Sequence, residues 1–169
     1  SASMDEDKKD LAKRFFTLLY LFLTRKYAEV DLVFIRHTDD AEEVDEDRFF
    51  HDTRSGGTVV LSALELAEQI RKERYASGWN VYAAQGSDGD AFGADPARSA
   101  RFLREHLLPA TRYYTYLELA APSTSERSST LWAEYERVAE STRNFAMRRA
   151  SEREQIYPVF RDLFKKEAQ

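Results

Sequence analysis

The stretch Trp79–Asp90, WNVYAAQGSDGD, carries the strongest fold signal in the chain. Residues 79–85 are mostly apolar or aromatic, which predicts a buried strand, and residues 86–90 supply the glycine, serine and aspartate that end a strand in a turn. A helix is predicted on each side, over residues 58–75 before the strand and 96–108 after it. Strands that alternate with helices in this way favour a parallel α/β sheet.

The alternation continues toward both ends of the chain. The other predicted strands cover residues 30–35 and 113–119, and the other predicted helices cover residues 5–27, 131–147 and 158–166. These elements predict an α/β core over residues 1–120, a Ser/Thr-rich loop over 121–130, and C-terminal helices within 131–169 that pack on the same domain. No internal repeat is visible.

One acidic segment interrupts the predicted core. Residues 39–47 hold seven acids in nine positions, which predicts an exposed loop or an edge hairpin. Such a charge run either offers a docking surface to a basic partner or keeps a sheet edge solvated and blocks edge pairing. The sequence leaves both alternatives open.

Composition describes a globular protein. The chain has 169 residues, 43% of them hydrophobic and 33% charged, and it contains no cysteine. Thiolate zinc sites, cysteine nucleophiles and disulfides are therefore excluded, and a reducing compartment, the cytoplasm, is expected. The apolar run Leu18–Leu23 is too short to span a bilayer, which needs about 20 apolar residues, so no membrane association is expected.

The net charge of −5 argues against nucleic acid as the main partner, because phosphate binding rests on clustered lysine and arginine. A local basic patch near the C-terminus would be the exception. It comprises Arg143, Arg148, Arg149 and Arg153.

Oxygen-bearing side chains occur in three separate segments that a sheet edge could bring together. They are Ser1-Ala2-Ser3, Gly56-Gly57-Thr58 before a helix, and Ser87-Asp88-Gly89 after a strand. Ligands of open α/β sheets collect at the carboxyl ends of the strands, and hydroxyl and carboxylate oxygens suit Mg²⁺ or Mn²⁺. Each segment by itself also fits a plain turn or a helix cap.

Several blocks of the sequence resemble the bacterial YeaH/YhbH family, and together they cover nearly the whole chain. The blocks are residues 34–38, 43–45, 56–58, 79–85, 87–90, 113–116, 130–132, 144–147 and 156–161. The resemblance implies a Rossmann-like, von Willebrand factor A-type open sheet, mostly parallel and flanked by helices. It also implies that the chain is the C-terminal part of a longer protein, truncated before the first central strand.

The resemblance further implies a metal site of the kind found in von Willebrand factor A-type domains. Ser1 and Ser3 match the two serines of the motif Asp-x-Ser-x-Ser, Thr58 matches the threonine ligand, and Asp88 matches the later aspartate. The first aspartate of that motif would lie upstream of residue 1. His37, Gly57 and Asp90 are candidates to line the same site.

Three functions are compatible with these residues. The first is a non-enzymatic interaction module in bacterial stress or starvation signalling, whose bound Mg²⁺ or Mn²⁺ captures an acidic side chain of a partner protein. By resemblance, that partner is a PrkA-type serine kinase or a SpoVR-like protein. The second is a metal-dependent hydrolase with His37 as the general base. The third is a structural scaffold that needs no metal.

Overall fold

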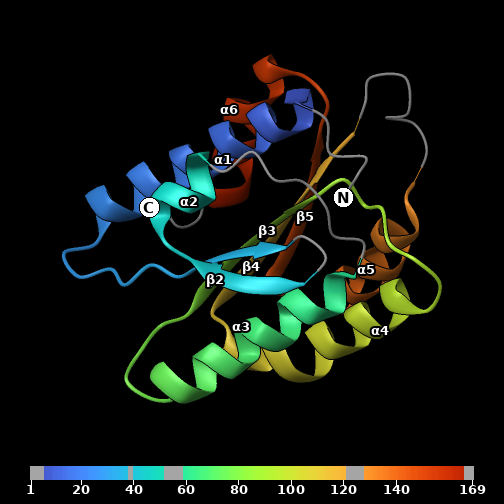
Figure 1. Ribbon diagram of the computed structural model, residues 1–169, viewed down its shortest axis with the longest axis horizontal. Helices are drawn as coiled ribbons and strands as arrows, with labels where there is room; N and C mark the ends of the chain where they lie inside the picture. Colours follow the sequence, from blue (N-terminus) through green and yellow to red (C-terminus); the bar gives the residue numbers. More distant parts are fainter. Residues whose placement is uncertain (1–5, 38–39, 52–58, 121–127, 166–169) are drawn as a thin grey trace.

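The centre of the computed structural model is a parallel sheet of three strands in the order β3-β4-β5, which Figure 1 shows between two layers of helices. The strands are β3 (Tyr82–Ser87), β4 (Tyr113–Leu119) and β5 (Phe145–Ala150). The structure describes residues 6–37, 40–51, 59–120 and 128–165. The expectation of a parallel α/β sheet flanked by helices is confirmed.

A separate antiparallel hairpin lies beside this sheet. It pairs β1 (Phe34–His37) with β2 (Ala41–Val44), and Phe34 faces Val44 in the register. The acidic segment therefore includes one strand of an edge hairpin, which was one of its two predicted forms. The short helix α2 (Glu46–His51) follows and was not predicted.

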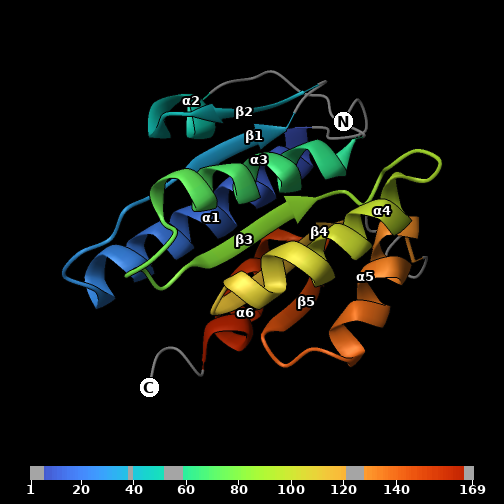
Figure 2. The ribbon, with the colours of Figure 1, turned by 90° about the horizontal axis from the view of Figure 1, so that it is seen from below.

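The helices divide between the two faces of the parallel sheet, as Figure 2 shows. One face is covered by α1 (Glu6–Lys26) and α6 (Arg153–Phe164), and the other by α3 (Val60–Arg74), α4 (Asp95–Phe102) and α5 (Thr130–Glu140). A π-helical turn (Leu103–Leu107) and a 3-10 turn (Leu108–Ala110) continue α4 toward β4.

Strand β4 is buried on both faces because it lies in the middle of the sheet. Its alternate residues Tyr114 and Tyr116 enter the core under α3, α4 and α5, whereas Leu117 and Leu119 enter the core under α1 and α6. Successive side chains of any strand point to opposite faces of the sheet. A strand that helices cover on both faces therefore consists mostly of apolar residues. The prediction of residues 113–119 as a strand is confirmed.

Strands β1 and β3 are less buried than predicted. Every residue of both strands is only partly buried, although the sequence predicts buried strands in each region. Strand β1 also begins at Phe34 rather than Val30. In the part of the chain that the structure describes, β1 pairs only with β2 and β3 pairs only with β4. One edge of each strand thus has no strand partner there.

Helices α1 and α3 connect the hairpin to the parallel sheet. Helix α3 contacts both β1 and β2, and its Val60 and Leu64 belong to the core over the parallel sheet. On the other face, the Phe16 ring of α1 packs against Phe49 of α2, with ring centroids 5.2 Å apart. Phe16 also lies over Gly86 of β3, where an added Cβ would come within 3.1 Å of the ring.

The C-terminal third departs most from the prediction. Residues 131–147 do not form one helix, because α5 ends at Glu140 and residues 145–150 form β5 beside β4. Helix α6 begins at Arg153, five residues before the predicted start, and it continues through Pro158. The sheet therefore gains a strand from a region predicted to be helical. The division of the chain at residues 120 and 130 stays a prediction.

Candidate functional site

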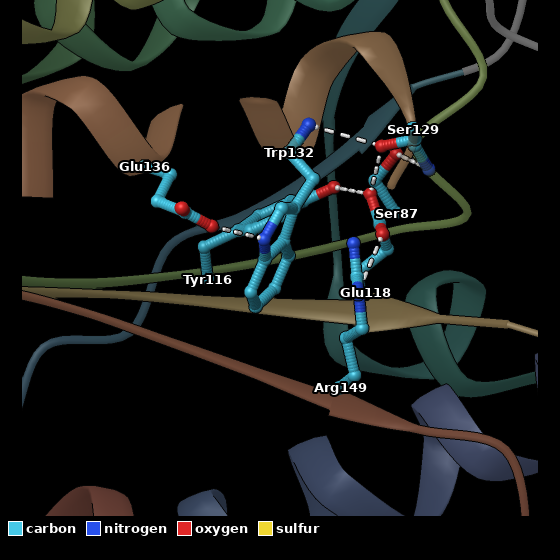
Figure 3. Close-up of polar contacts among 8 residues, drawn as sticks. Ser87, Tyr116, Glu118, Ser129, Trp132, Glu136 and Arg149 are labelled. Carbon is cyan, nitrogen blue, oxygen red and sulfur yellow. Dashed lines mark hydrogen bonds and ion pairs between the residues drawn. The ribbon is translucent and has the colours of Figure 1, made fainter. Parts of the chain in front are cut away.

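Three polar side chains stand side by side at the carboxyl edge of the parallel sheet. The register places Ser87 of β3 opposite Glu118 of β4, and Glu118 opposite Arg149 of β5. Because all three strands are parallel, their carboxyl ends meet at the same edge, where open α/β sheets commonly bind ligands. Figure 3 shows these side chains with Tyr116, Ser129 and Trp132 around them.

Glu118 is the centre of this group, which we call the Glu118 cluster: Ser87, Tyr116, Glu118, Ser129 and Arg149. Its Oε1 accepts hydrogen bonds from the Tyr116 hydroxyl at 3.0 Å and from the Ser129 hydroxyl. Its Oε2 accepts from Arg149 Nε at 3.2 Å. Only 2% of Glu118 is exposed, so these donors replace nearly all of its contact with water.

Burial raises the pKa of the Glu118 carboxyl above its ordinary value of 4.5. The hydrogen bonds from Ser129 and Tyr116 and the charge of Arg149 oppose that rise. Desolvation disfavours the charged form of any acid, whereas donors and a nearby cation favour it. Three converging donors fit a carboxylate, which has acceptors only.

The N-terminus of α5 is attached to the same cluster. Ser129 is the N-cap of α5, and its Oγ accepts from the backbone N–H of Trp132 at 2.9 Å. The guanidinium of Arg149 lies 4.0 Å from the centre of the Trp132 ring, within the range of a cation–π interaction. The Trp132 indole N–H donates to Glu136 at 2.7 Å.

Asp88 and Asp90 lie on the loop that follows β3, and two backbone turns shape this loop. Asp88 Oδ1 accepts from the N–H of Asp90, and Ser87 Oγ accepts from the N–H of Gly89, each at 3.0 Å. Gly89 has φ of 78°, a left-handed conformation that favours glycine. The loop thus presents two acids directly beyond the end of a strand.

His37 is the last residue of β1 and lies at the end of the hairpin where the chain turns toward β2. Its Nε2 is buried and has no hydrogen-bond partner among the residues that the structure describes. Burial lowers the pKa of His37 below its ordinary value of 6.5, and the charge of Asp95 opposes this effect. The neutral imidazole, which can accept a proton, is therefore favoured.

Asp95 joins the segment after Thr58 to the segment after Asp88. From the first turn of α4, its carboxylate accepts from the backbone N–H groups of Val60 at 2.8 Å and Leu61 at 3.3 Å. These N–H groups belong to the first turn of α3 and have no partner within that helix. The starts of α3 and α4 are thereby held together.

The predicted ligand set falls only partly within the described residues. Asp88, Asp90 and His37 are described, whereas Ser1, Ser3, Gly57 and Thr58 lie outside the described residues. Within the described residues, no group of three or more histidine, aspartate or glutamate side chains could hold a metal ion. The metal site therefore stays a prediction.

Sequence reasoning missed the Glu118 cluster, although two signals for it are present. Glu118 is the one acid in the apolar strand 113–119, and Ser129 stands three residues before Trp132, as an N-cap does. Arg149 gave no such signal, because residues 145–150 were not recognised as a strand.

The basic patch predicted near the C-terminus is largely occupied by internal ion pairs. Arg148 pairs with Asp162 at 2.6 Å, Arg149 with Glu118 at 3.2 Å, and Arg153 with Asp10 at 3.1 Å. These arginines neutralise acids of the chain itself, which leaves less positive charge for phosphate contacts.

Two hollows lie away from this edge. A small apolar cavity of about 40 Å³ lies between α1 and the strands β3 and β4. Its lining residues include Leu19, Phe22 and Tyr82. A wider groove of about 550 Å³ runs between α1 and α2, with Lys13 and Asp47 among its lining residues. Neither is lined by a residue of the Glu118 cluster.

Comparison with known proteins gives the chain a family. The model of a family described as "Protein of unknown function (DUF444)" matches residues 1–167. The chain belongs to the DUF444 family. YeaH/YhbH, the family that the sequence resembles, is a related name for the DUF444 family.

Curated relatives of this DUF444 chain carry the name UPF0229 protein. The chain is 54% identical to the one from Thiobacillus denitrificans, 52% to the one from Vibrio parahaemolyticus and 50% to the one from Pectobacterium carotovorum. Each match includes 99% of this chain but 39% of the relative. The chain thus spans about two fifths of the length of these bacterial proteins.

Helix length and hydropathy bear on membrane association. Across the described residues, no helix combines the length and the apolar character that a membrane crossing requires.

Proposed function

We propose that this DUF444 chain is part of a protein-interaction module that uses a divalent metal ion. In this proposal Mg²⁺ or Mn²⁺ is bound by Ser1, Ser3, Thr58 and Asp88, together with an aspartate supplied by the chain upstream. One coordination position stays open and takes a carboxylate from the partner protein, because both ions prefer hard oxygen ligands. Gly57 and Asp90 would line the site.

The proposal rests on the hydrogen bonds that the Asp95 carboxylate accepts from the first turn of α3. Two of the predicted ligands, Thr58 and Asp88, come from segments that are 30 residues apart in the sequence. Asp95 links the first turn of α3, just after Thr58, to the first turn of α4, just after the Asp88 loop. Residues that must share one ion need this kind of constraint, since ordering two loops costs conformational entropy.

The fold expected of a von Willebrand factor A-type domain is also part of the proposal. Strands β1 and β3 each have an edge without a strand partner in the described residues, and both are only partly buried. A strand from the upstream chain, carrying the missing aspartate, would satisfy the backbone groups of both edges. The two sheets would then become one.

Ion titration of the full-length protein tests the metal site. An ion at about 100 times its dissociation constant adds about 2.7 kcal/mol, which corresponds to a rise in Tm of roughly 5–10 °C where a unit the size of these 169 residues unfolds by itself, and to a smaller rise where the whole protein unfolds together. We expect this rise with Mg²⁺ or Mn²⁺ and its loss in Thr58→Ala and Asp88→Ala. Asp47→Asn, at an exposed acid on α2, is the control. An equal rise in all four proteins would refute the site.

The proposed partner is a protein of the same stress or starvation pathway, a PrkA-type serine kinase or a SpoVR-like protein, and the proposed setting is the cytoplasm. Binding of the full-length protein to each candidate should require the ion and should disappear in Asp88→Ala. Binding that is unchanged by a chelator would instead support the structural scaffold.

The metal-dependent hydrolase is the second candidate, and His37 is the residue that favours it. Burial lowers the pKa of His37, which keeps its imidazole unprotonated at neutral pH, and its Nε2 has no partner among the described residues, so this nitrogen can take a proton from an ion-bound water. Ion-dependent hydrolysis of a phosphoester that disappears in His37→Ala would establish this function. Ion-dependent partner binding without hydrolysis would exclude it.

A further inference from the structure

The loop that carries Asp88 rests directly on the carboxylate of Glu118. At Gly89 the backbone comes so close that an added Cβ would overlap Glu118 Oε1 and Ser129 Oγ. Side chains at position 89 are therefore excluded twice, by this contact and by the φ of 78°. The close approach fixes where the loop leaves the sheet edge.

The hydrogens of the cluster have one consistent arrangement. The Ser129 hydroxyl receives the N–H of Trp132, so its single hydrogen is free to go to Glu118. Ser87 likewise receives the N–H of Gly89 and is hydrogen-bonded to Tyr116, whose own hydrogen goes to Glu118. Glu118 is thus the final acceptor of two series of hydrogen bonds, one that starts in α5 and one that starts in the Asp88 loop.

A glutamine at position 118 would not serve as well as the glutamate. A glutamine has the same shape, but its amide nitrogen is a donor and would face Ser129 and Tyr116 or else Arg149, which all donate. A donor that faces a donor in a buried site leaves both unsatisfied, which costs more than the loss of an ordinary hydrogen bond.

We propose that Glu118 is the positioning residue of the candidate site: it seats the Asp88–Asp90 loop on the end of the sheet and thereby sets the direction in which Asp88 points. Its part in ion binding rests on the proposed metal function, whereas its seating of the loop does not. The same carboxylate also holds Arg149 against Trp132. The position of the loop and the start of α5 are therefore fixed by one group.

Two variants of the full-length protein separate this role from a general loss of charge. Glu118→Gln replaces one of the two carboxylate oxygens with an amide N–H donor, and Glu136→Gln makes the same change at an exposed carboxylate that contacts the same Trp132. Amide hydrogen exchange at Gly89 and Asp90 reports the loop directly, because both N–H groups donate within it. Amides in the middle of α3 serve as the internal reference.

We expect exchange at Gly89 and Asp90 to be about tenfold faster in Glu118→Gln and unchanged in Glu136→Gln, since local opening follows the lost contacts. The apparent affinity for Mg²⁺ or Mn²⁺ should fall by about tenfold in Glu118→Gln alone. Ion affinity is measured on folded protein, so a loss of stability that leaves the loop in place would not change it.

The outcomes distinguish this proposal from the metal function. One outcome is that loop exchange is faster in Glu118→Gln while the unsubstituted protein binds no ion. That outcome would support the seating of the loop by Glu118 and refute the metal site. Ion binding and loop exchange that are both the same in Glu118→Gln and Glu136→Gln would refute the role of Glu118 and leave the metal site intact. If Glu118→Gln does not fold, Tyr116→Phe removes one donor to the same carboxylate. Loop exchange unchanged in Tyr116→Phe would then overturn the proposal.

Discussion

At the scale of single residues, buried polar atoms in this protein are shared between several partners. Gln85 of β3 is the clearest example after Glu118. Its Oε1 accepts from the hydroxyl of Tyr114 at 2.7 Å and from that of Tyr135 at 2.9 Å. Burial raises the pKa of both phenols, so both remain protonated and both need an acceptor.

Replacing Gln85 with leucine should therefore leave two buried hydroxyls without an acceptor. We expect the free energy of unfolding to fall by about 2–4 kcal/mol, measured by urea denaturation, because each unsatisfied buried group costs about 1–3 kcal/mol. Gln69→Leu, at an exposed position of α3, is the matched control and should change stability by less than about 0.5 kcal/mol. Equal effects at the two positions would contradict this account.

His37 should make stability depend on pH in mildly acidic solution. Its folded-state pKa lies below 6.5, so the stability that neutral His37 contributes is complete above pH 6.5 and is lost as the pH falls through the lowered pKa. In a series of melting temperatures, His37→Gln should flatten the decline below pH 6.5. His51→Gln, at an exposed histidine, is the control for the loss of a histidine side chain. If the curve of His37→Gln overlays that of the unsubstituted protein, the pKa of His37 does not change on folding.

At the scale of elements, tertiary contacts override local propensity in the C-terminal third. Residues 145–150, FAMRRA, contain alanine, methionine and arginine, which favour helices, yet they form β5. Pairing with β4 gives the backbone of this segment its hydrogen bonds, and Phe145 and Met147 enter the core under α5. Propensity is a weak preference that such burial outweighs.

Asn144 prepares the entry into β5. Its Nδ2 donates to the carbonyls of Leu108 at 2.9 Å and Thr111 at 2.8 Å, and so joins the turn before β4 to the start of β5. Asn144→Asp should place an acceptor against two carbonyl acceptors and lower the free energy of unfolding by about 2–3 kcal/mol. Denaturation of Asn80→Asp, at an exposed asparagine, provides the comparison. A loss at Asn144 no larger than that at Asn80 would argue against a role in joining the two strands.

At the scale of the whole molecule, two sheets share one pair of helical layers. Helix α3 contacts the hairpin and also the core over the parallel sheet, while α1 reaches from β3 to α2. The hairpin and the parallel sheet are therefore held in one body although they are not paired with each other. In the described residues β1, β2, β3 and β5 each have one edge without a strand partner, and β1 and β3 are the two of these strands in which every residue is only partly buried.

Backbone exchange will show whether a further strand occupies these edges. We expect the amides of β1 and β3 to be at least about tenfold better protected in the full-length protein than in residues 1–169 alone, because strand pairing satisfies backbone N–H groups that water otherwise reaches. Amides of β4, already paired on both sides, are the internal reference. Equal protection of β1 and β3 in both chains would mean that no upstream strand pairs there.

The candidate site was predictable only where the chemistry is local. The turn that carries Asp88 and Asp90 was predicted, because glycine, serine and aspartate follow an apolar strand there, and the part of these acids in a metal site stays a prediction. Glu118 and Arg149 were not predicted, because their pairing depends on the register between β4 and β5, which are far apart in sequence.

The sequence by itself determined the strand at residues 113–119 and the helices on each side of the predicted strand 79–85, limited the acidic segment to a loop or an edge hairpin, and placed the chain in the DUF444 family. These features depend on residue type and on periods of two or 3.6 residues, which are local properties of the chain. Only the tertiary structure decided that residues 145–150 form a strand, that β1 and β3 each have an edge without a strand partner in the described residues, and that Glu118 lies beneath the Asp88 loop. Those outcomes depend on which distant segments come into contact, and burial and pairing between such segments outweigh local preference.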